Sequence, residues 1–162
     1  MRLFAALASI ALTIGCATAM AQPLSFSALE GQWRGQGTFR GAPSEVTATF
    51  APMFEGAAYT LDIDVRFTPA NGQPTRFQGK GGYALRNGAP VGGSWIDNFG
   101  NGYAISPRFE DNALIVDWGT ATFHGRSEYR LEADGDLRVE DFVQGQGGQW
   151  QSFALAELRR AH

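Results

Sequence analysis

The chain has 162 residues, a formal net charge of −3 and 18% charged residues, and its acidic and basic side chains are interspersed. Because it has no basic cluster, it lacks the electrostatic signature of a nucleic-acid-binding protein, and we expect no nucleic-acid partner. Its length suits one folded core rather than several.

The first 21 residues have the pattern of an export signal. Arg2 precedes an uncharged apolar stretch over residues 3–14, and small residues then lead to Ala19-Met20-Ala21. This order is typical of a cleaved signal peptide, and the apolar stretch is shorter than the roughly 20 residues of a membrane-spanning helix. We therefore predict that residues 1–21 are a signal peptide, that residues 22–162 form one β-barrel domain without a membrane span, and that the protein is periplasmic or secreted.

A second interpretation of the same segment stays open. Thr13-Ile14-Gly15-Cys16 resembles a bacterial lipobox, although that motif prefers Leu where Thr13 stands. The protein would then be a lipoprotein anchored at Cys16. Cys16 is the only cysteine, so cleavage after Ala21 leaves a mature chain that can form no disulfide.

The segment after Gln22-Pro23 predicts one short helical turn, because Ser25 or Ser27 can cap it and Gly31 can end it. From there the sequence predicts about ten β-strands, since apolar and polar residues alternate with a period of two, which no helix would produce. The clearest run is 59–67, in which the apolar residues share one face and the charged residues share the other. The expected strands are 32–40, 45–50, 59–67, 76–85, 91–97, 102–107, 113–118, 123–131, 137–143 and 150–158.

Short turn signals separate these strands and predict how they connect. They are Asn71-Gly72, Asn87-Gly88, Asn101-Gly102, Asp111-Asn112 and Asp134-Gly135. Such short connections make neighbouring strands antiparallel, so the predicted fold class is all-β, an up-and-down meander of about ten strands. Closure into a barrel is favoured over a sandwich because glycines on the expected inner face permit sharp bends; these are Gly35, Gly37, Gly79 and Gly81.

Gly31-Gln32-Trp33, behind the helical turn and at the start of the first strand, resembles the Gly-x-Trp signature of lipocalins and other calycins. In that family the Trp covers the barrel floor beneath an Arg from the end of the last strand. The resemblance therefore implies structural roles for Gly31, for Trp33 and for Arg159 or Arg160.

The longer string Gly31-x-Trp33-x-Gly35-x-Gly37 is similar to nitrobindin-type ten-stranded barrels. Bacterial lipocalin-like barrels have a mid-chain motif that is similar to Tyr83, Gly93, Trp95, Asp97 and Gly100. Nitrobindin-like proteins bind haem through a His in the last strand, where this chain has Phe153, which cannot coordinate iron. We therefore expect no haem and assign no cofactor.

The sequence also offers little to a metal ion. His124 falls on the charged face of its strand and His162 is the last residue, so the two form no usual metal-ligand pattern. Residues 97–102 resemble the start of a calcium-binding loop, but Phe99 stands at a position where such a loop needs an oxygen ligand. A hairpin turn is the predicted structure there, and no metal site is assigned.

The expected inner face is rich in aromatic residues, which could line a pocket or fill it. Ten strands and several inward glycines favour a pocket. We predict that a small apolar or aromatic molecule binds inside, with a tyrosine hydroxyl as hydrogen-bond partner, and that the protein is monomeric. The candidate ligand-binding residues are Tyr59, Phe67, Phe77, Tyr83, Trp95 and Tyr103.

Two alternatives remain. A non-catalytic envelope or interaction module with a filled core would use its loops, for example an apolar patch around Phe99 or Phe109. A barrel enzyme acting on a small hydrophobic substrate would need an inward carboxylate, or His124. The candidate carboxylates are Asp97, Asp117 and Asp141. Since no nucleophile elbow, phosphate-binding loop or dinucleotide fingerprint is present, no catalytic residue is assigned.

Overall fold

The computed structural model describes residues 24–70 and 72–161, so the predicted signal peptide, the lipobox-like Cys16 and His162 lie outside the described residues. In chain order the elements are α1 (Phe26–Leu29), β1 (Gly31–Phe39), β2 (Ala42–Met53), the 3-10 turn η1 (Phe54–Gly56), β3 (Ala58–Phe67), β4 (Thr75–Arg86), β5 (Ala89–Asp97), β6 (Gly102–Glu110), β7 (Ala113–Gly119), β8 (His124–Leu131), β9 (Leu137–Gln144) and β10 (Trp150–Arg160).

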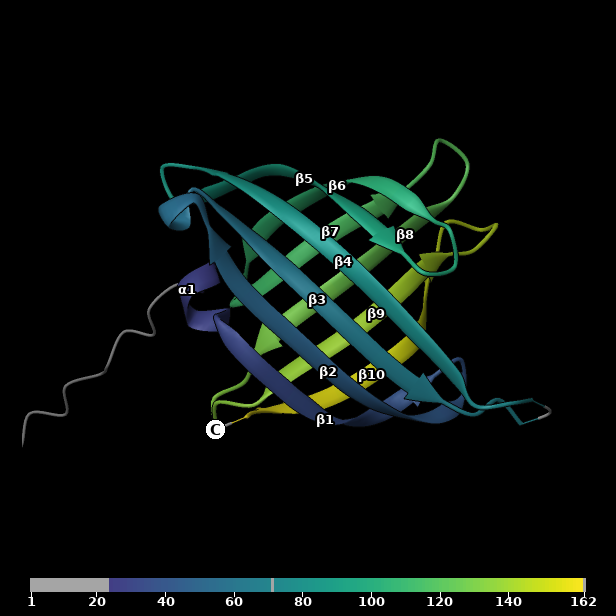
Figure 1. Cartoon of the computed structure of the whole chain (residues 1–162). Helices are drawn as coiled ribbons and strands as arrows, with labels where there is room; N and C mark the ends of the chain where they lie inside the picture. The colour runs from purple at the N-terminus through teal and green to yellow at the C-terminus, as the bar shows by residue number, and fades with distance from the viewer. Residues whose placement is uncertain (1–23, 71, 162) are drawn as a thin grey trace, which may run out of the picture.

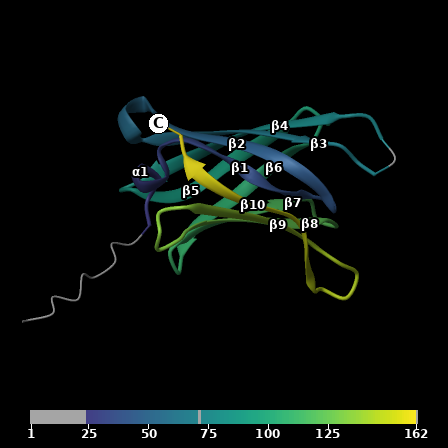
Figure 2. The same ribbon diagram turned by 90° about the horizontal axis from the view of Figure 1, so that it is seen from below.

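The ten strands form a closed barrel in which each strand is antiparallel to its neighbours (Figure 1). β10 pairs with β1 and so joins the two ends of the meander, which is also visible from below (Figure 2). The predicted fold class is confirmed. The second strand is longer than expected at both ends, because Ala42 to Ser44 already pair with β1 across a tight turn and Ala51 to Met53 still pair with β3.

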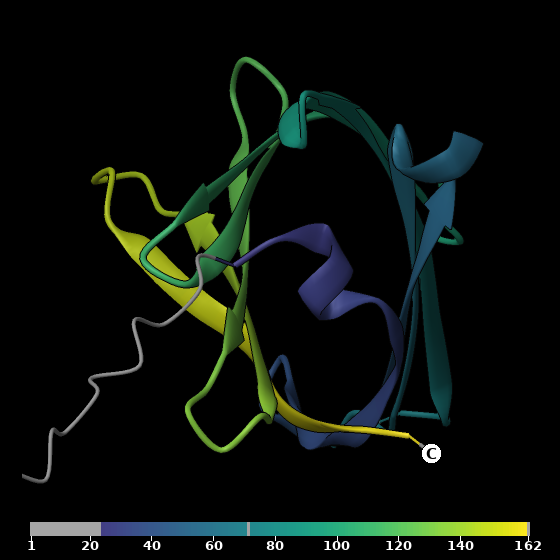
Figure 3. The same ribbon diagram turned by 90° about the vertical axis from the view of Figure 1, so that its left-hand side faces the viewer.

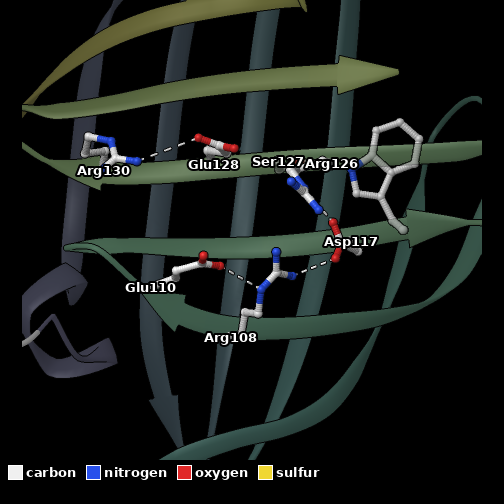
Figure 4. Close-up of polar contacts among 8 residues, drawn as sticks. Arg108, Glu110, Asp117, Arg126, Ser127, Glu128 and Arg130 are labelled. Carbon is white, nitrogen blue, oxygen red and sulfur yellow. Dashed lines mark hydrogen bonds and ion pairs between the residues drawn. The ribbon is translucent and has the colours of Figure 1, made fainter. Parts of the chain in front are cut away.

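The period-two alternation sorts the side chains between the interior and the outer surface. In β3, Leu61, Ile63 and Val65 are buried, whereas Asp62 and Asp64 lie outside and form ion pairs with basic residues of β4. On the opposite wall Asp117 also lies outside, where it accepts hydrogen bonds from Arg108 (2.6 Å) and Arg126 (2.7 Å), as Figure 4 shows. Asp117 is therefore not an inward acid, because Val116 and Trp118 take the inward positions of β7.

Two of the inner-face glycines serve the closing seam of the barrel. A Cβ atom at Gly35 or Gly37 would collide with backbone atoms of β10, the strand that pairs with β1. These residues therefore allow two backbones to approach closely, a role that we had not predicted for them.

One end of the barrel, hereafter the closed end, is blocked by α1. Figure 3 looks onto this end and shows the short helix lying within the ring of strands. Phe26 of α1 packs against Tyr59, Tyr83 and Phe109, with ring centroids 5.0, 5.1 and 5.2 Å away. Phe109, which we had considered as part of an apolar loop patch, thus lies in β6 and contributes to this core.

Trp33 anchors the closed end. Its side chain is fully buried, and its indole N–H donates a hydrogen bond to the carbonyl oxygen of Leu29 (2.7 Å). The guanidinium group of Arg160 lies 4.2 Å from the centre of the Trp33 ring and donates to the carbonyl oxygens of Ala28 (2.8 Å) and Glu30. The last strand is therefore tied to both the helix and the first strand.

The two arginines at the end of β10 have different surroundings. Arg160 is the one that covers Trp33, whereas Arg159 points away and pairs with Asp136 on the outer surface (3.3 Å). Gly31 joins α1 to β1 with a φ of +116°, a conformation that side-chain-bearing residues rarely adopt.

Candidate functional site

The opposite end of the barrel, hereafter the open end, leads into a cavity of about 410 Å³. This volume lies within the range of about 300–1,000 Å³ that is common for small-molecule sites. The sequence allowed the aromatic residues of the inner face either to fill the interior or to line a pocket, and in the structure they do both. Around Trp33 and α1 they fill the closed end, and towards the open end they surround a hollow.

Aromatic rings form the walls of the cavity. On one wall Phe77 and Trp95 are nearly parallel, with ring centroids 6.4 Å apart. On the other wall the ring centroids of Tyr103 and Trp118 are 5.6 Å apart. Phe153 also lines the cavity, and its ring contacts that of Trp118 edge-on. A planar apolar molecule would thus meet ring faces and edges on several sides.

Two glycines make room for the indole rings of these walls. A Cβ atom at Gly79 would overlap the ring of Trp95, and one at Gly125 would overlap the ring of Trp118. Each indole can therefore lie flat against the barrel wall. If either glycine carried a side chain, the indole would have to move into the cavity.

The mouth of the cavity is partly apolar and partly charged. Phe99 and Phe123 are 49% and 42% exposed there, and the guanidinium group of Arg40 lies 5.7 Å from the ring centre of Phe39. Asp97 lies at the mouth as well, and its carboxylate accepts hydrogen bonds from the backbone N–H of Phe99 and of Asn101.

The carboxylate of Asp97 is therefore occupied within its own loop. Residues 97–102 form the hydrogen-bonded connection between β5 and β6, as the hairpin prediction had it. Across residues 24–70 and 72–161, no three His, Cys, Asp or Glu side chains come together as a possible metal site.

A polar cluster lies at the inner end of the cavity. It consists of Asp141 from β9, Ser127 and Tyr129 from β8, and Tyr83 from β4. Ser127 and Asp141 are direct partners across the strand pair, and the Ser127 hydroxyl accepts a hydrogen bond from the indole N–H of Trp118 (3.1 Å). We call these four residues the polar cluster.

The protein environment changes the acidity of three members of the polar cluster. Burial raises the pKa of Asp141 to about 6, although the neighbouring Ser127 hydroxyl partly opposes this rise. Burial and the nearby charge of Asp141 also raise the pKa of the Tyr83 and Tyr129 hydroxyls above their ordinary value. Both phenols therefore keep their protons at neutral pH, when the Asp141 carboxyl is mostly ionised.

Four of the six predicted ligand-binding residues line the cavity: Phe77, Tyr83, Trp95 and Tyr103. Tyr59 lies under Phe26 at the closed end, and Phe67 packs behind Phe39 with ring centroids 4.6 Å apart. Neither of the last two lines the cavity.

Three members of the polar cluster are not among the predicted ligand-binding residues: Asp141, which we considered only as a candidate carboxylate of an enzyme, Ser127 and Tyr129. A signal for all three was available in the alternation. Asp141 falls between Val139 and Val143 on the apolar face of its run, and Ser127 and Tyr129 share the inner face of theirs.

The residues around the cavity do not fit a histidine-ligated haem. Phe153 contributes its ring to the lining, and His124 is exposed on the outer surface of β8. Among the described residues, no histidine or cysteine lines the cavity.

Comparisons with known proteins place the fold but not the family. No family model matches the chain, and no curated protein is detectably similar to it in sequence. Among solved structures, the barrel is similar to Rv2717c from M. tuberculosis, with a TM-score of 0.60 and 17% identity over 84% of this chain and 94% of that one. It is also similar to the S-type phycobiliprotein lyase CPES from Guillardia theta, with a TM-score of 0.50 and 8% identity over 85% of this chain and 90% of that one. The chain thus shares the fold of these two structures, and its closed ten-stranded antiparallel barrel is lipocalin-like.

Proposed function

We propose that the protein binds a small apolar or aromatic molecule in the cavity at the open end. The observation that carries this proposal is the cavity itself, about 410 Å³ in volume, walled by aromatic rings and ending in a small polar cluster. Sites for small molecules commonly combine mostly apolar walls with a few well-placed polar groups. The hydroxyl of Tyr83 or Tyr103 would supply a hydrogen bond to the bound molecule.

Binding is tested with the neutral fluorescent probe N-phenyl-1-naphthylamine, whose emission rises in apolar surroundings. Wild-type protein is compared with Gly125→Ala, in which the new methyl group drives the Trp118 ring into the cavity. Gly82→Ala is the matched control, since a Cβ atom there has only the Ser94 hydroxyl within contact distance, at 3.9 Å. We expect the Gly125→Ala variant to bind about tenfold more weakly or worse, and the control to bind like wild type. Equal binding by all three proteins would show that the cavity is not the site.

A second candidate function is catalysis on a small hydrophobic substrate. One observation favours it: Asp141 is an inward carboxyl group whose pKa of about 6 suits a general acid or base. The S-type phycobiliprotein lyase indicates that a barrel of this shape can carry an activity.

A sensitive probe for a general base is 5-nitrobenzisoxazole. Removal of its ring C–H proton by a carboxylate breaks the N–O bond and releases a coloured phenolate, while the carboxyl group keeps the proton. Turnover that disappears in Asp141→Asn would support the catalytic candidate. Equal rates for both proteins would remove it.

The interaction-module alternative receives less support, because it assumed a filled core and a loop patch that included Phe109. That side chain packs inside the barrel against Phe26. Phe99 remains exposed, but it lies at the cavity mouth, where it could equally guide a ligand inwards.

The proposal includes export as a monomer. It is supported by the signal-peptide pattern of residues 1–21, with lipidation at Cys16 as the alternative. No helix among the residues that the structure describes is long and apolar enough to cross a membrane. Mass spectrometry of protein purified from the periplasm distinguishes cleavage after Ala21 from a lipid-modified chain that begins at Cys16. Its native mass reports the oligomeric state.

A further inference from the structure

Asp141 is an inward-facing, half-buried acid without a positively charged partner among the described residues. All ion pairs among the described residues lie on the outer surface, and none involves Asp141. Its chain neighbour Glu140 illustrates the difference, because it points outwards and pairs with Arg138 (2.8 Å). The single basic residue among the described residues of the cavity lining is Arg40, which is exposed at the mouth.

The groups that face Asp141 from the surrounding strands are polar but uncharged or apolar. β8 contributes Ser127 and Tyr129, β4 contributes Tyr83, and β10 contributes Ala154. The charged group that acts on the Asp141 carboxyl is Glu140, and its charge is negative as well. A half-buried carboxylate that faces an aromatic cavity is destabilised unless a cation or strong hydrogen-bond donor reaches it.

We propose that the molecule bound in the cavity carries a protonated nitrogen on an aromatic or conjugated framework, and that Asp141 is the counter-ion of this nitrogen. This inference rests on the proposed function, since it requires a ligand in the cavity. It adds the class of ligand, an organic cation or weak base that donates N–H to the carboxylate.

Two further features of the cavity suit such a ligand. Its walls are built from aromatic ring faces, including those of Trp95 and Trp118, and such faces attract cations. The second carboxylate of the lining, Asp97, adds negative charge at the mouth. An anionic ligand would be repelled by both acids and would find only the exposed Arg40 as a partner.

The test uses three naphthalenes of nearly equal size: 1-naphthylmethylamine, 1-naphthalenemethanol and 1-naphthoate. The first is a cation, the second is neutral and the third is an anion at pH 7.5, so that charge is the main variable. Their dissociation constants are measured by calorimetry with wild-type protein, with Asp141→Asn and with Asp62→Asn. The last variant is the control for net charge, because Asp62 lies on the outer surface and pairs with Lys80.

For wild-type protein at pH 7.5 we expect the amine to bind about tenfold or more tightly than the alcohol, because a hydrogen bond between charged groups is stronger than a neutral one. The naphthoate should bind most weakly. Asp141→Asn should bring the ratio of amine to alcohol affinity close to one, and Asp62→Asn should leave it unchanged.

A measurement on the wild-type protein alone keeps the inference testable if Asp141→Asn folds poorly. The amine stays protonated between pH 4.5 and 7.5, whereas the Asp141 carboxyl becomes protonated over that range. The preference for the amine should therefore fall about tenfold at pH 4.5.

The outcomes separate the two proposals. If the alcohol binds as tightly as the amine while Gly125→Ala still weakens both, the cavity binds ligands but the cation inference is wrong. If the preference for the amine survives in Asp141→Asn or at pH 4.5, Asp141 is not the counter-ion. If none of the three naphthalenes binds and the neutral probe does not bind either, the proposed function itself fails.

Discussion

Replacing Asp141 with Asn should stabilise the ligand-free barrel at neutral pH and leave its stability nearly unchanged at pH 3.8 or below. The reason is the difference in acidity between the folded chain, where the pKa of this carboxyl is about 6, and the unfolded chain, where it is near its ordinary value of 3.8. Folding therefore favours the protonated carboxyl.

The sign and the size of the effect follow from proton linkage. Between pH 3.8 and 6 the folded chain holds a proton that the unfolded chain has released, so the free energy of unfolding falls as the pH rises. Above pH 6 both states are ionised and the loss is complete. It amounts to about 3 kcal/mol, because each tenfold change in acid strength corresponds to about 1.36 kcal/mol. Asn keeps the shape of the side chain without the charge and should recover most of this free energy.

The assay is urea unfolding of wild type and Asp141→Asn, followed by tryptophan fluorescence at pH values from 4 to 8. The difference in the free energy of unfolding should grow from near zero at pH 4 to its full value just above pH 6 and then stay constant. A difference that is the same at every pH, or that favours wild type at pH 7, would refute the reasoning.

Asp117→Asn is the control for the stability measurement. Burial raises the pKa of Asp117, but hydrogen bonds from Arg126 and Arg108 outweigh this, so the net pKa lies below its ordinary value. The stability that this outward carboxylate contributes is lost only as the pH falls below 3.8. Asp117→Asn should therefore destabilise the barrel by the same amount at every pH from 5 to 8.

Two further predictions concern packing. Gly79→Ala places a methyl group where the Trp95 ring lies, so it should destabilise the barrel by about 1–3 kcal/mol and weaken probe binding. Gly82→Ala on the same strand should do neither. Urea unfolding measures the loss of stability, and the fluorescence titration measures the loss of binding. Arg160→Ala removes the cation above the indole of the closed end and two hydrogen bonds to carbonyl oxygens, so it should cost about 1–2 kcal/mol. Arg159→Ala, which removes only an exposed ion pair, should change the free energy of unfolding by less than about 0.5 kcal/mol, and equal losses for the two arginines would contradict the assignment.

Much of the fold could be predicted because the alternation within each strand shows which of its faces points into the barrel. The run 59–67 alternates apolar and polar residues without interruption, and the structure places its apolar members inside. The inner-face glycines were harder to interpret. Gly35 faces the backbone of β10, a strand more than 100 residues later in the chain. No local pattern can reveal a contact of that kind, because it depends on which strands meet when the barrel closes.

The division of the interior into a filled end and a hollow end depends on α1. The sequence predicts a short helical turn before the first strand, but the same four residues could lie outside the barrel or inside it. In the structure Phe26 packs against three rings from three strands, so α1 lies inside the barrel. No such side chain fills the centre of the barrel near the open end, and the rings there line a cavity. Tyr59 therefore belongs to the core and Tyr103 to the cavity, although both have the same place in the alternation.

The position of each acid within its own strand could have distinguished the three candidates for catalysis. Asp117 stands one position after Val116 and one before Trp118, so an inward Trp118 forces it outwards. Asp97 ends its strand and turns to the backbone of its own loop. Asp141 lies two residues after Val139 and two before Val143, the position of a core residue. An ionised acid in such a position is held there against its preference for water, and at neutral pH a hydrogen-bond donor or cation that reaches the carboxylate lowers that cost. The charge that destabilises the empty barrel is thus the same charge that would select its ligand.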